Sequence, residues 1–429
     1  MPSGKRDPKY WLYLEPYVHV STAAHAVLFY NSLTGNRFEI PKSGRIPRIT
    51  ERLVLPGNGY VTGLTGADLK EPAVNALVLK LQETFMGDLL DPAWSMGKPA
   101  NILPEPYFKS YLTKDLITKP EAREAIDFDN YIHEVVLYLN SGSPESEESF
   151  PLATRQFVYP GRTLERSAVL PWPDLARFIR HLSMYKITSV QVSGSGIPDY
   201  PDLPSLSDLL AESGFPAHYH IHAGQFDPVM AKALTRHGNS KISIHFTFPV
   251  NLDLLNSIIT SLPAIGDAKK TNFQFMVTSA EELETAQEII SRANLPNPWL
   301  NPYYNGKNFS FFRETVFITR DDIGNSRPDQ HQVFSRLTVN ESDFGRFTLL
   351  PDGSIHANLN DPPVGVLGSV QPEEMILKEL LDGASWVRTR KNVSPCRDCL
   401  YHFLCPPVSS YELLMNRFNF CDVFENPAE

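Results

Sequence analysis

The chain has 429 residues, 42% of them hydrophobic and 11% aromatic, which is enough to bury a large core in about two to four domains. Its formal net charge is −10 and its basic residues are dispersed. Nucleic acid is therefore not expected as a partner, because phosphate binding requires clustered lysine and arginine. No apolar stretch approaches the roughly 18 residues of a membrane span, and Met1–Glu15 lacks the apolar core of an export signal, so no membrane partner is expected.

The first 92 residues are expected to form a small module of strands and helices. Short β-prone runs between turn residues predict four strands, which are Tyr10–Leu14, Tyr17–Ser21, Ala26–Asn31 and Arg37–Ile40. The sequence Thr65-Gly66-Ala67-Asp68 is typical of a helix start, and Pro72–Phe85 carries apolar residues at helical spacing. This order predicts a winged-helix module. A proline-rich stretch follows, so residues 93–130 are expected to be a linker.

Residues 131–330 alternate between strand and helix patterns. The predicted strands are Val135–Leu139, Ser189–Val192, His218–His222, Ile242–Phe246 and Phe273–Val277. The predicted helices are Trp172–Met184, Leu203–Glu212, Asp227–Thr235, Leu252–Ser261 and Ala280–Arg292. Such alternation is typical of a parallel sheet, either open or barrel-like. The units are too few for the eight of a closed barrel. The fold class is therefore α/β.

Residues 331–429 begin with a hairpin pattern and end with the cysteines. Arg346–Leu350 and Ser354–Leu359 flank a Pro351-Asp352-Gly353 turn, and a helix is expected near Glu373–Leu381. All four cysteines follow within the last 34 residues, with the spacing Cys396-x2-Cys399-x5-Cys405-x15-Cys421.

The clustering of the cysteines predicts one metal or iron–sulfur site. Thiolates bind zinc and iron strongly, and four of them complete the ligand set of either a zinc ion or a four-iron cluster. Two disulfides or buried structural cysteines are the alternatives. Disulfide frameworks belong mainly to small secreted domains, whereas thiols confined to one site suit a reducing cytoplasm. The spacing alone does not choose between zinc and a cluster.

A histidine-rich strand offers a competing enzyme hypothesis. His218, His220 and His222 fall on one face of a strand because side chains there repeat every two residues, and His245 lies on the next strand. A His-x-His strand supplies two ligands in metal-dependent hydrolases. No later strand offers an obvious completing set beyond Asp227. The favoured interpretation is that these histidines line the polar interior of the barrel.

Two other motifs are weak. Gly194-Ser195-Gly196 lacks the lysine of a phosphate-binding loop and the third glycine of a dinucleotide fingerprint, so a plain strand-to-helix turn is expected. The acidic run Glu145–Glu148 is interpreted as a solvated loop.

The C-terminal part resembles the SPASM extension of radical-SAM peptide-modifying enzymes. The resemblance rests on Phe347–Ile355 with its Asp-Gly turn, on Leu367-Gly368, and on the Cys-x2-Cys-x5-Cys motif. It implies that one auxiliary 4Fe–4S cluster is held by Cys396, Cys399, Cys405 and Cys421. The second cluster of that family would need cysteines within His356-Ala357-Asn358 and at Ser409, so its absence is expected.

The middle part resembles the radical-SAM partial barrel of six βα units. In that family Cys-x3-Cys-x2-Cys follows the first strand and holds the cluster that binds S-adenosylmethionine. Here Asn140–Ser149 contains no cysteine, and acidic and hydroxyl side chains cannot replace three thiolates. Where the family has Gly-Gly-Glu-Pro, this chain has Ser193–Pro198 without a carboxylate. The resemblance therefore implies that S-adenosylmethionine is not bound.

The first module resembles a RiPP recognition element, which binds the leader of a ribosomal precursor peptide. By that resemblance the peptide would add as a strand beside Ala26–Asn31 and pack on the helix near Pro72–Phe85. The whole chain resembles the pseudo-radical-SAM/SPASM proteins of Bacteroidales Gly-Gly-leader peptide maturation. Its opening run Tyr10–Val18 and its closing run Tyr411–Cys421 support that match.

We therefore expect a non-catalytic accessory protein of the cytoplasm that binds a precursor peptide leader, a radical-SAM partner enzyme, or both, and carries one 4Fe–4S cluster. The expected architecture is a partial (β/α)6 barrel between a winged-helix module and a SPASM-like domain. Two alternatives stay open. One is a metal-dependent hydrolase using His218, His220 and His222, and the other is a binding protein stapled by zinc.

Overall fold

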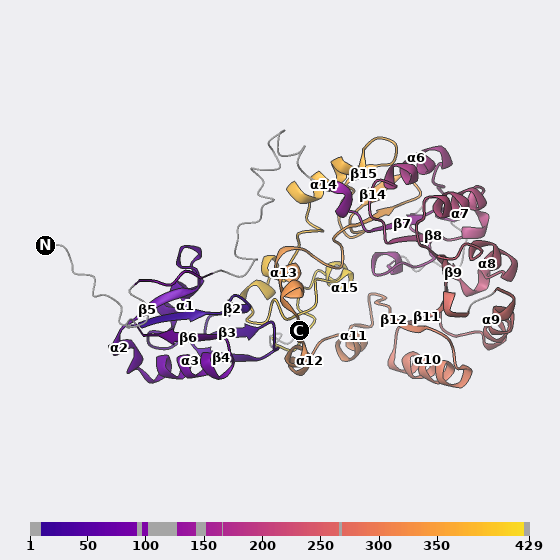
Figure 1. The fold of residues 1–429 in the computed structure, drawn as a ribbon. Helices are drawn as coiled ribbons and strands as arrows, with labels where there is room; N and C mark the ends of the chain where they lie inside the picture. Colours follow the sequence, from indigo (N-terminus) through magenta and orange to yellow (C-terminus); the bar gives the residue numbers. More distant parts are fainter. Residues whose placement is uncertain are drawn as a thin grey trace.

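The computed structural model describes residues 10–91, 97–101, 127–142, 152–164, 166–265 and 268–423. Figure 1 shows the first module at one end of the molecule and the α/β part at the other, with C-terminal segments between them. Most of the predicted linker and the acidic run Glu145–Glu148 lie outside the described residues. None of the described helices is both long enough and apolar enough to cross a membrane.

The first module contains two three-stranded sheets within the described residues. The order of the first is β5 (Val61–Leu64), β1 (Tyr10–Leu14) and β6 (Gly87–Leu90), and the order of the second is β2 (Val18–Thr22), β3 (Ala26–Asn31) and β4 (Arg37–Pro41). Three helices complete the module, namely α1 (Ile46–Val54), α2 (Gly66–Leu69) and α3 (Pro72–Glu83). The four predicted strands are confirmed. The sequence patterns missed β5, β6 and α1.

Local sequence explains where the helices of this module begin and end. Thr65 and Asp68 form a reciprocal capping box, which satisfies two backbone donors and starts α2 at the predicted place. The helix α3 begins with Pro72, which is favoured in the first turn. It ends at Glu83, so its predicted extension to Phe85 is wrong. Phe85 has a positive φ of 55°, which is incompatible with a right-handed helix, so the chain has already left the helix there.

The position of β3 corrects the predicted peptide site. Backbone hydrogen bonds pair β3 with β2 on one side and with β4 on the other. A further strand cannot add beside Ala26–Asn31, because both of its edges are already used. The outer strands of this sheet are β2 and β4.

The large sheet has nine strands within the described residues. Six of them are parallel and lie in chain order, from β7 (Glu134–Tyr138) through β8 (Ser189–Ser193), β9 (Ala217–His222), β10 (Lys241–Phe246) and β11 (Thr271–Val277) to β12 (Pro298–Pro302). The connecting helices are α6 (Trp172–Leu182), α7 (Leu203–Glu212), α8 (Pro228–Leu234), α9 (Leu252–Ile265) and α10 (Ala280–Ala293). The mixed α/β class and the parallel sheet predicted from the alternation are confirmed. The strand β12 was not predicted.

The helices of this part lie on one side of the sheet (Figure 1). Outward-facing strand residues such as Leu137, Val192 and Ile244 join the helices in one hydrophobic core. Strands in sequential order with helices on one face curve like part of a barrel. The other face of the sheet is therefore concave and is called the inner face below.

The C-terminal hairpin extends the same sheet. β13 (Arg346–Leu349) pairs in parallel with β7, and β14 (Ser354–His356) and β15 (Gly365–Val366) follow in antiparallel order. The turn forms at Asp352-Gly353 as predicted, because Asp352 accepts from the amide of Ser354 and Gly353 has a positive φ of 83°. The remaining helices are α11 (Phe309–Thr315), α12 (Arg320–Asn325), α13 (Gln330–Thr338), α14 (Pro372–Leu381) and α15 (Ser410–Leu414). Short 3-10 turns include η4 (Ala153–Arg155), η6 (Ala223–Gln225), η7 (Ala268–Lys270), η8 (Arg390–Asn392) and η9 (Cys396–Asp398).

Candidate metal centre and the inner face of the sheet

The four cysteines line one small cavity. Cys396, Cys399, Cys405 and Cys421 are all buried, all carry free thiols, and border the same space together with Ile318, Ile323 and Phe420. The short turn η9 places Cys396 and Cys399 close together, since the amide of Cys399 donates to the carbonyl of Cys396. Cys421 is positioned at the cavity by a β-bridge with Ile318. The structure therefore brings together all four residues that the sequence singled out.

Arg390 holds the segments around this cavity in place. Its guanidinium forms a buried ion pair with Glu412 at 2.9 Å and donates to the carbonyl of Phe418 at 3.1 Å. It also lies 3.6 Å from the Cys396 sulfur. Burial by itself would lower the pKa of Arg390, but the charge of Glu412 and its hydrogen bonds to the guanidinium outweigh this and raise the pKa. The arginine is therefore a fixed cation beside the thiols.

The buried surroundings of the cysteines favour the protonated thiol over the thiolate as long as no metal is bound. Burial raises the pKa of Cys399 to about 11 and that of Cys405 to about 12. Burial also raises the pKa of Cys396, although Arg390 opposes the effect. The backbone amide of Tyr401 donates to the Cys399 sulfur at 3.4 Å. Metal binding must release these protons, so the pocket would bind metal more tightly as the pH rises.

The cysteine segment packs against the first module. Leu28 and Tyr30 of β3 belong to the same hydrophobic cluster as Cys399, Tyr401 and Cys405. The Tyr401 hydroxyl donates to the Glu39 carboxylate on β4 and accepts from Arg320 at 2.9 Å. The candidate metal centre therefore covers one face of the sheet β2-β3-β4.

The histidine strand lies as predicted, with three imidazoles on the inner face. Tyr219 and Ile221, which alternate with them, belong to the outward core. His220 uses both ring nitrogens, because Nδ1 lies 2.9 Å from Nε2 of His245 and Nε2 lies 2.7 Å from the Gln191 amide oxygen. Neither nitrogen is left to bind a metal ion in this arrangement.

The other two histidines of the strand are also engaged in the fold. Nε2 of His218 lies 2.8 Å from the Ser243 hydroxyl, and the His222 ring accepts from the amide of Gly224. Among the described residues, no group of three or more His, Cys, Asp or Glu side chains is placed to hold a single metal ion. The contacts favour the interpretation that these histidines line the interior of the partial barrel.

Tyr159 fills the inner face at the carboxyl ends of the parallel strands. Its backbone amide donates to the Tyr138 hydroxyl at 3.4 Å, and its carbonyl accepts from the Ser193 hydroxyl at 3.1 Å. Its buried ring stands edge-on against His245 with 5.5 Å between ring centroids, and packs with Met276. Ligand sites of parallel α/β sheets usually lie at this end. Here protein side chains occupy that volume.

The glycine turn after β8 is locked by Asn140, which follows β7. The Asn140 amide donates to the carbonyl of Gly196, and its oxygen accepts from the amide of Gly196 at 3.0 Å. A Cβ at Gly194 would lie 2.7 Å from the same oxygen, so a side chain would not fit. The turn is a structural strand-to-helix connection, as the sequence predicted.

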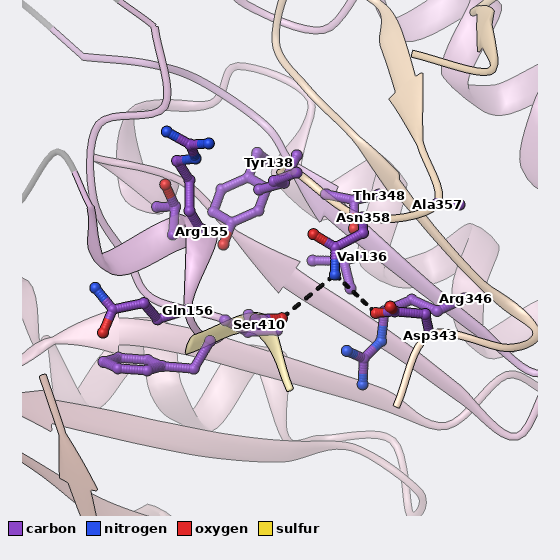
Figure 2. Close-up of a pocket in the computed structure, with 14 residues that line it drawn as sticks. Val136, Tyr138, Arg155, Gln156, Asp343, Arg346, Thr348, Ala357, Asn358 and Ser410 are labelled. Atoms are coloured by element: carbon purple, nitrogen blue, oxygen red, sulfur yellow. Dashed lines mark hydrogen bonds between the residues drawn. The ribbon is translucent and has the colours of Figure 1, made fainter. Parts of the chain in front are cut away.

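Figure 2 shows a second pocket, between β7, β13 and the segment after the hairpin. Asn358 points into it and donates to Asp343 at 2.8 Å and to the Ser410 hydroxyl at 3.4 Å. The resemblance would place the ligands of a second cluster in the stretch that contains Ala357 and Asn358 and at the position just before Ser410. These two segments do meet, and an amide and hydroxyl network joins them.

Sequence reasoning missed Arg390, Tyr159 and Asn140. Arg390 lies in a basic stretch with no motif. The run Phe157-Val158-Tyr159, bounded by Pro160-Gly161, is apolar enough to indicate burial, and this was the available signal for Tyr159.

No protein-family model matches the chain, and no curated protein matches it significantly. Among solved structures, it is similar to SuiB of Streptococcus suis bound to the precursor peptide SuiA, with 11% identity, coverage of 97% of this chain and 99% of that chain, and a TM-score of 0.44. It is also similar to the radical-SAM enzyme coproporphyrinogen III oxidase (HemN) of Escherichia coli, with 11% identity, coverage of 44% and 48%, and a TM-score of 0.30. BtrN in complex with AdoMet and 2-DOIA shows 10% identity, coverage of 63% and 94%, and a TM-score of 0.30. Likenesses this weak carry no conclusion about what this chain does.

Proposed function

We propose that this chain is a non-catalytic accessory protein of peptide maturation, with a radical-SAM-like partial barrel that no longer binds S-adenosylmethionine. It carries one 4Fe–4S cluster on Cys396, Cys399, Cys405 and Cys421. It binds a ribosomal precursor peptide through its first module and acts beside a radical-SAM partner enzyme. The observation that carries the non-catalytic part is the placement of Tyr159, whose contacts span the strand ends at which a cofactor of such a barrel would bind.

The geometry of the cysteines supports a cluster over a zinc ion. A single zinc ion needs four thiolates about 2.3 Å from one point. The four sulfurs border one cavity, and their cysteines have the spacing that the resemblance assigns to a four-iron cluster. A cluster of four irons is larger and accepts more widely separated thiolates. When bound, it would supply either electron transfer or a brace for the C-terminal segment.

The open edge of β4 supports the peptide-binding part of the proposal. The amide of Asn31 donates to Asn36, and the amide of Lys42 donates to His25. Because hydrogen-bonded pairs alternate in an antiparallel ladder, the backbone groups of Arg37 and Glu39 point away from β3. An extended peptide would pair with these groups by β-augmentation. The proposed peptide edge is thus β4 rather than the β3 position expected from the sequence.

Iron binding tests the cluster. We expect anaerobically reconstituted protein to contain about four irons per chain and to be brown. Cys399→Ala should lose most of this iron, because it removes one of the four thiolates that ligate the cluster. Iron is quantified together with zinc in the same sample. The matched control is Ser183→Ala, at the exposed end of α6 away from the cysteine cavity, which should keep the iron content. Four-thiol zinc binding without iron would contradict the cluster.

A proline in β4 tests peptide binding. Glu39→Pro removes an outward amide that an added strand would use, while edge strands otherwise accept proline. Glu39→Ala loses the same side-chain bond to Tyr401 but keeps the amide, so it is the matched control. Each chain is expressed with an affinity tag in the native host, and the peptides that co-purify with it are identified by mass spectrometry. We expect the leader with the wild type and Glu39→Ala but at least about tenfold less with Glu39→Pro. Equal recovery with all three chains would exclude the β4 edge.

A further inference from the structure

A small open pocket on the surface of the first module brings aromatic rings and carboxylates together. Its volume is about 300 Å³, and the side chains that define its chemistry are those of Tyr13, Glu15, Tyr17, Gln82, Phe85 and Asp88. We call it the aromatic–acidic pocket. Among the described residues, none that lines it belongs to β4 or borders the cysteine cavity, so the proposed function does not use it.

The strands β1 and β6 place one ring and both carboxylates on the same face of their sheet. Tyr13 of β1 pairs directly with Asp88 of β6, so their side chains are neighbours. Glu15 follows Tyr13 by two residues, and its amide continues the ladder by donating to the carbonyl of Met86 at 2.9 Å. Leu14, between them, is buried in the core of the module. Side chains alternate along a strand, so Glu15 lies on the same face as Tyr13.

Two turns add the other two rings. The first turn is closed by the amide of Val18, which donates to the carbonyl of Glu15 at 3.0 Å. It carries Tyr17, whose hydroxyl donates to the carbonyl of Phe85 in the second turn at 2.9 Å. Burial and, after it, the charge of Glu15 raise the pKa of Tyr17, in agreement with a carboxylate near this ring. Phe85 is 73% exposed and has a φ of 55°, a conformation in which glycine would be less strained.

The two carboxylates of the pocket have no cation beside them. No described lysine, arginine or histidine lines the pocket, and neither Glu15 nor Asp88 forms an ion pair with any of those residue types in the described chain. Asp88 accepts from the Gln82 amide at 2.6 Å, which is a neutral donor. Lys80, on the same helix as Gln82, is paired with Glu83 at 2.9 Å. A cation that enters the pocket would therefore meet two carboxylates that are not already neutralised.

Aromatic rings and carboxylates in one pocket are suited to an organic cation. The face of an aromatic ring attracts a cation through its quadrupole, and a carboxylate pairs with the charge. A guanidinium group uses both, because it is planar, stacks on rings and donates two parallel hydrogen bonds to a carboxylate. It is also more weakly hydrated than an ammonium group, so it loses less hydration when it enters the pocket. These properties favour arginine.

We propose that the aromatic–acidic pocket binds one arginine side chain of a polypeptide partner. The guanidinium group lies against the rings of Tyr13, Tyr17 and Phe85. Its charge is paired with the carboxylates of Glu15 and Asp88. Because the pocket is open to solvent, the side chain enters while the backbone of the partner stays outside. A single exposed contact of this kind is weak, so an isolated arginine binds in the millimolar range and contributes to affinity as one part of a larger interface.

Saturation-transfer NMR titrations of the reconstituted full chain test the site. The probe is the capped tripeptide alanine–arginine–alanine at concentrations up to about 20 mM. The comparison peptide carries citrulline, which is neutral and has nearly the same shape as arginine. We expect the arginine peptide to bind at least about fivefold more tightly, because only its side chain is charged. No binding of the arginine peptide, equal binding of both peptides, or tighter binding of tetramethylammonium would overturn the proposal.

Two variants locate the binding. Glu15→Gln should weaken binding of the arginine peptide about threefold, because one carboxylate is lost. Its matched control is Glu51→Gln at an exposed position of α1, which changes the net charge equally but does not line the pocket. Phe85→Gly removes a ring where φ favours glycine, so it should weaken binding about threefold without lowering the unfolding temperature. Binding that both variants leave unchanged would place the peptide elsewhere and refute the assignment.

The outcome is independent of the proposed function. Glu15→Gln and Phe85→Gly should keep the iron content of the wild type, because neither residue borders the cysteine cavity. Glu39→Pro should keep the affinity for the arginine peptide, because Glu39 does not line the aromatic–acidic pocket. Loss of binding in Glu39→Pro together with unchanged binding in Glu15→Gln would move the arginine site to the β4 edge and contradict the inference.

Discussion

Two buried charged side chains, Arg390 and Asp343, show how single residues fix the C-terminal part. Arg390 has a carboxylate partner, Glu412, and keeps its charge. Asp343 is 2% exposed and receives neutral amide donors from Asn340 and Asn358, both at 2.8 Å. Amides stabilise a carboxylate less than a cation does, so the cost of burial is offset in the first case and only partly in the second.

Asp343 gives a pH-dependent prediction. Burial raises its pKa from 3.8 to about 7, although Asn358, Arg346 and Arg388 act in the opposite direction. The folded state therefore binds this proton more tightly than the unfolded state. The stabilisation is complete below pH 4 and is lost as the pH rises through about 7.

We expect the contribution of Asp343 to the free energy of unfolding to fall as the pH rises from about 4 to about 7 and then to level off, as one titrating group would produce. The measurement is thermal or urea unfolding across this range. Asp343→Asn, a close isostere of the protonated acid, should reduce the slope. The control is Asp352→Asn at the exposed hairpin turn. A slope that Asp343→Asn leaves intact would show that this carboxyl is not the titrating group.

At the scale of elements, the segment that carries Cys399 and Tyr401 also forms one wall of the first module. The rings of His19 and Tyr30 lie 6.1 Å and 5.9 Å from that of Phe403. Tyr401 bonds to β4 through its hydroxyl and to a cysteine sulfur through its amide. Tyr401 therefore links the cysteine segment to β4, so a change that orders the cysteine segment should also stabilise β4.

This connection predicts that the cluster protects the first module. Hydrogen exchange of the β3 and β4 amides should slow when the cysteine pocket is filled, since metal binding adds free energy to the structure around it. Tyr401→Phe removes a side-chain hydrogen bond of about 1 kcal/mol and should reduce this protection at β4.

Tyr17→Phe is the matched control for Tyr401→Phe. Its hydroxyl donates to Phe85 at 2.9 Å in the same module but is not bonded to the cysteine segment. It should leave the effect of the cluster on exchange unchanged. Equal exchange of β4 with and without bound iron would show that the two elements are independent.

At the scale of the whole molecule, one sheet joins the middle and C-terminal parts of the sequence. β13 pairs with β7, although about 210 residues separate them in the chain. The inner face of this sheet has a filled end at Tyr159.

The filled end predicts that this chain does not cleave S-adenosylmethionine. The segment after β7 contains no cysteine, and Tyr159 occupies the carboxyl ends of the strands. We expect no 5′-deoxyadenosine above background from the pure reconstituted protein with dithionite, even when the cysteine site is fully loaded with iron. The control is an active radical-SAM enzyme in the same assay. Product formed by the pure chain and lost in Tyr159→Trp would contradict the proposal.

The sequence by itself determined the types of the main elements and the gathering of the cysteines. Repeats of two and 3.6 residues are local, so they predicted strands such as β9 and helices such as α6. Short spacing likewise made the convergence of Cys396, Cys399 and Cys405 predictable. The patterns missed β12, because its prolines and polar residues lack the alternation of a strand.

Only the tertiary structure decided which edges and volumes are free. The central position of β3, the filling by Tyr159 and the ion pair of Arg390 each depend on residues far apart in the chain. Such contacts leave no periodic or short-range signal in one sequence, because their geometry is set by how whole elements pack. For this reason the proposed peptide edge moved from β3 to β4.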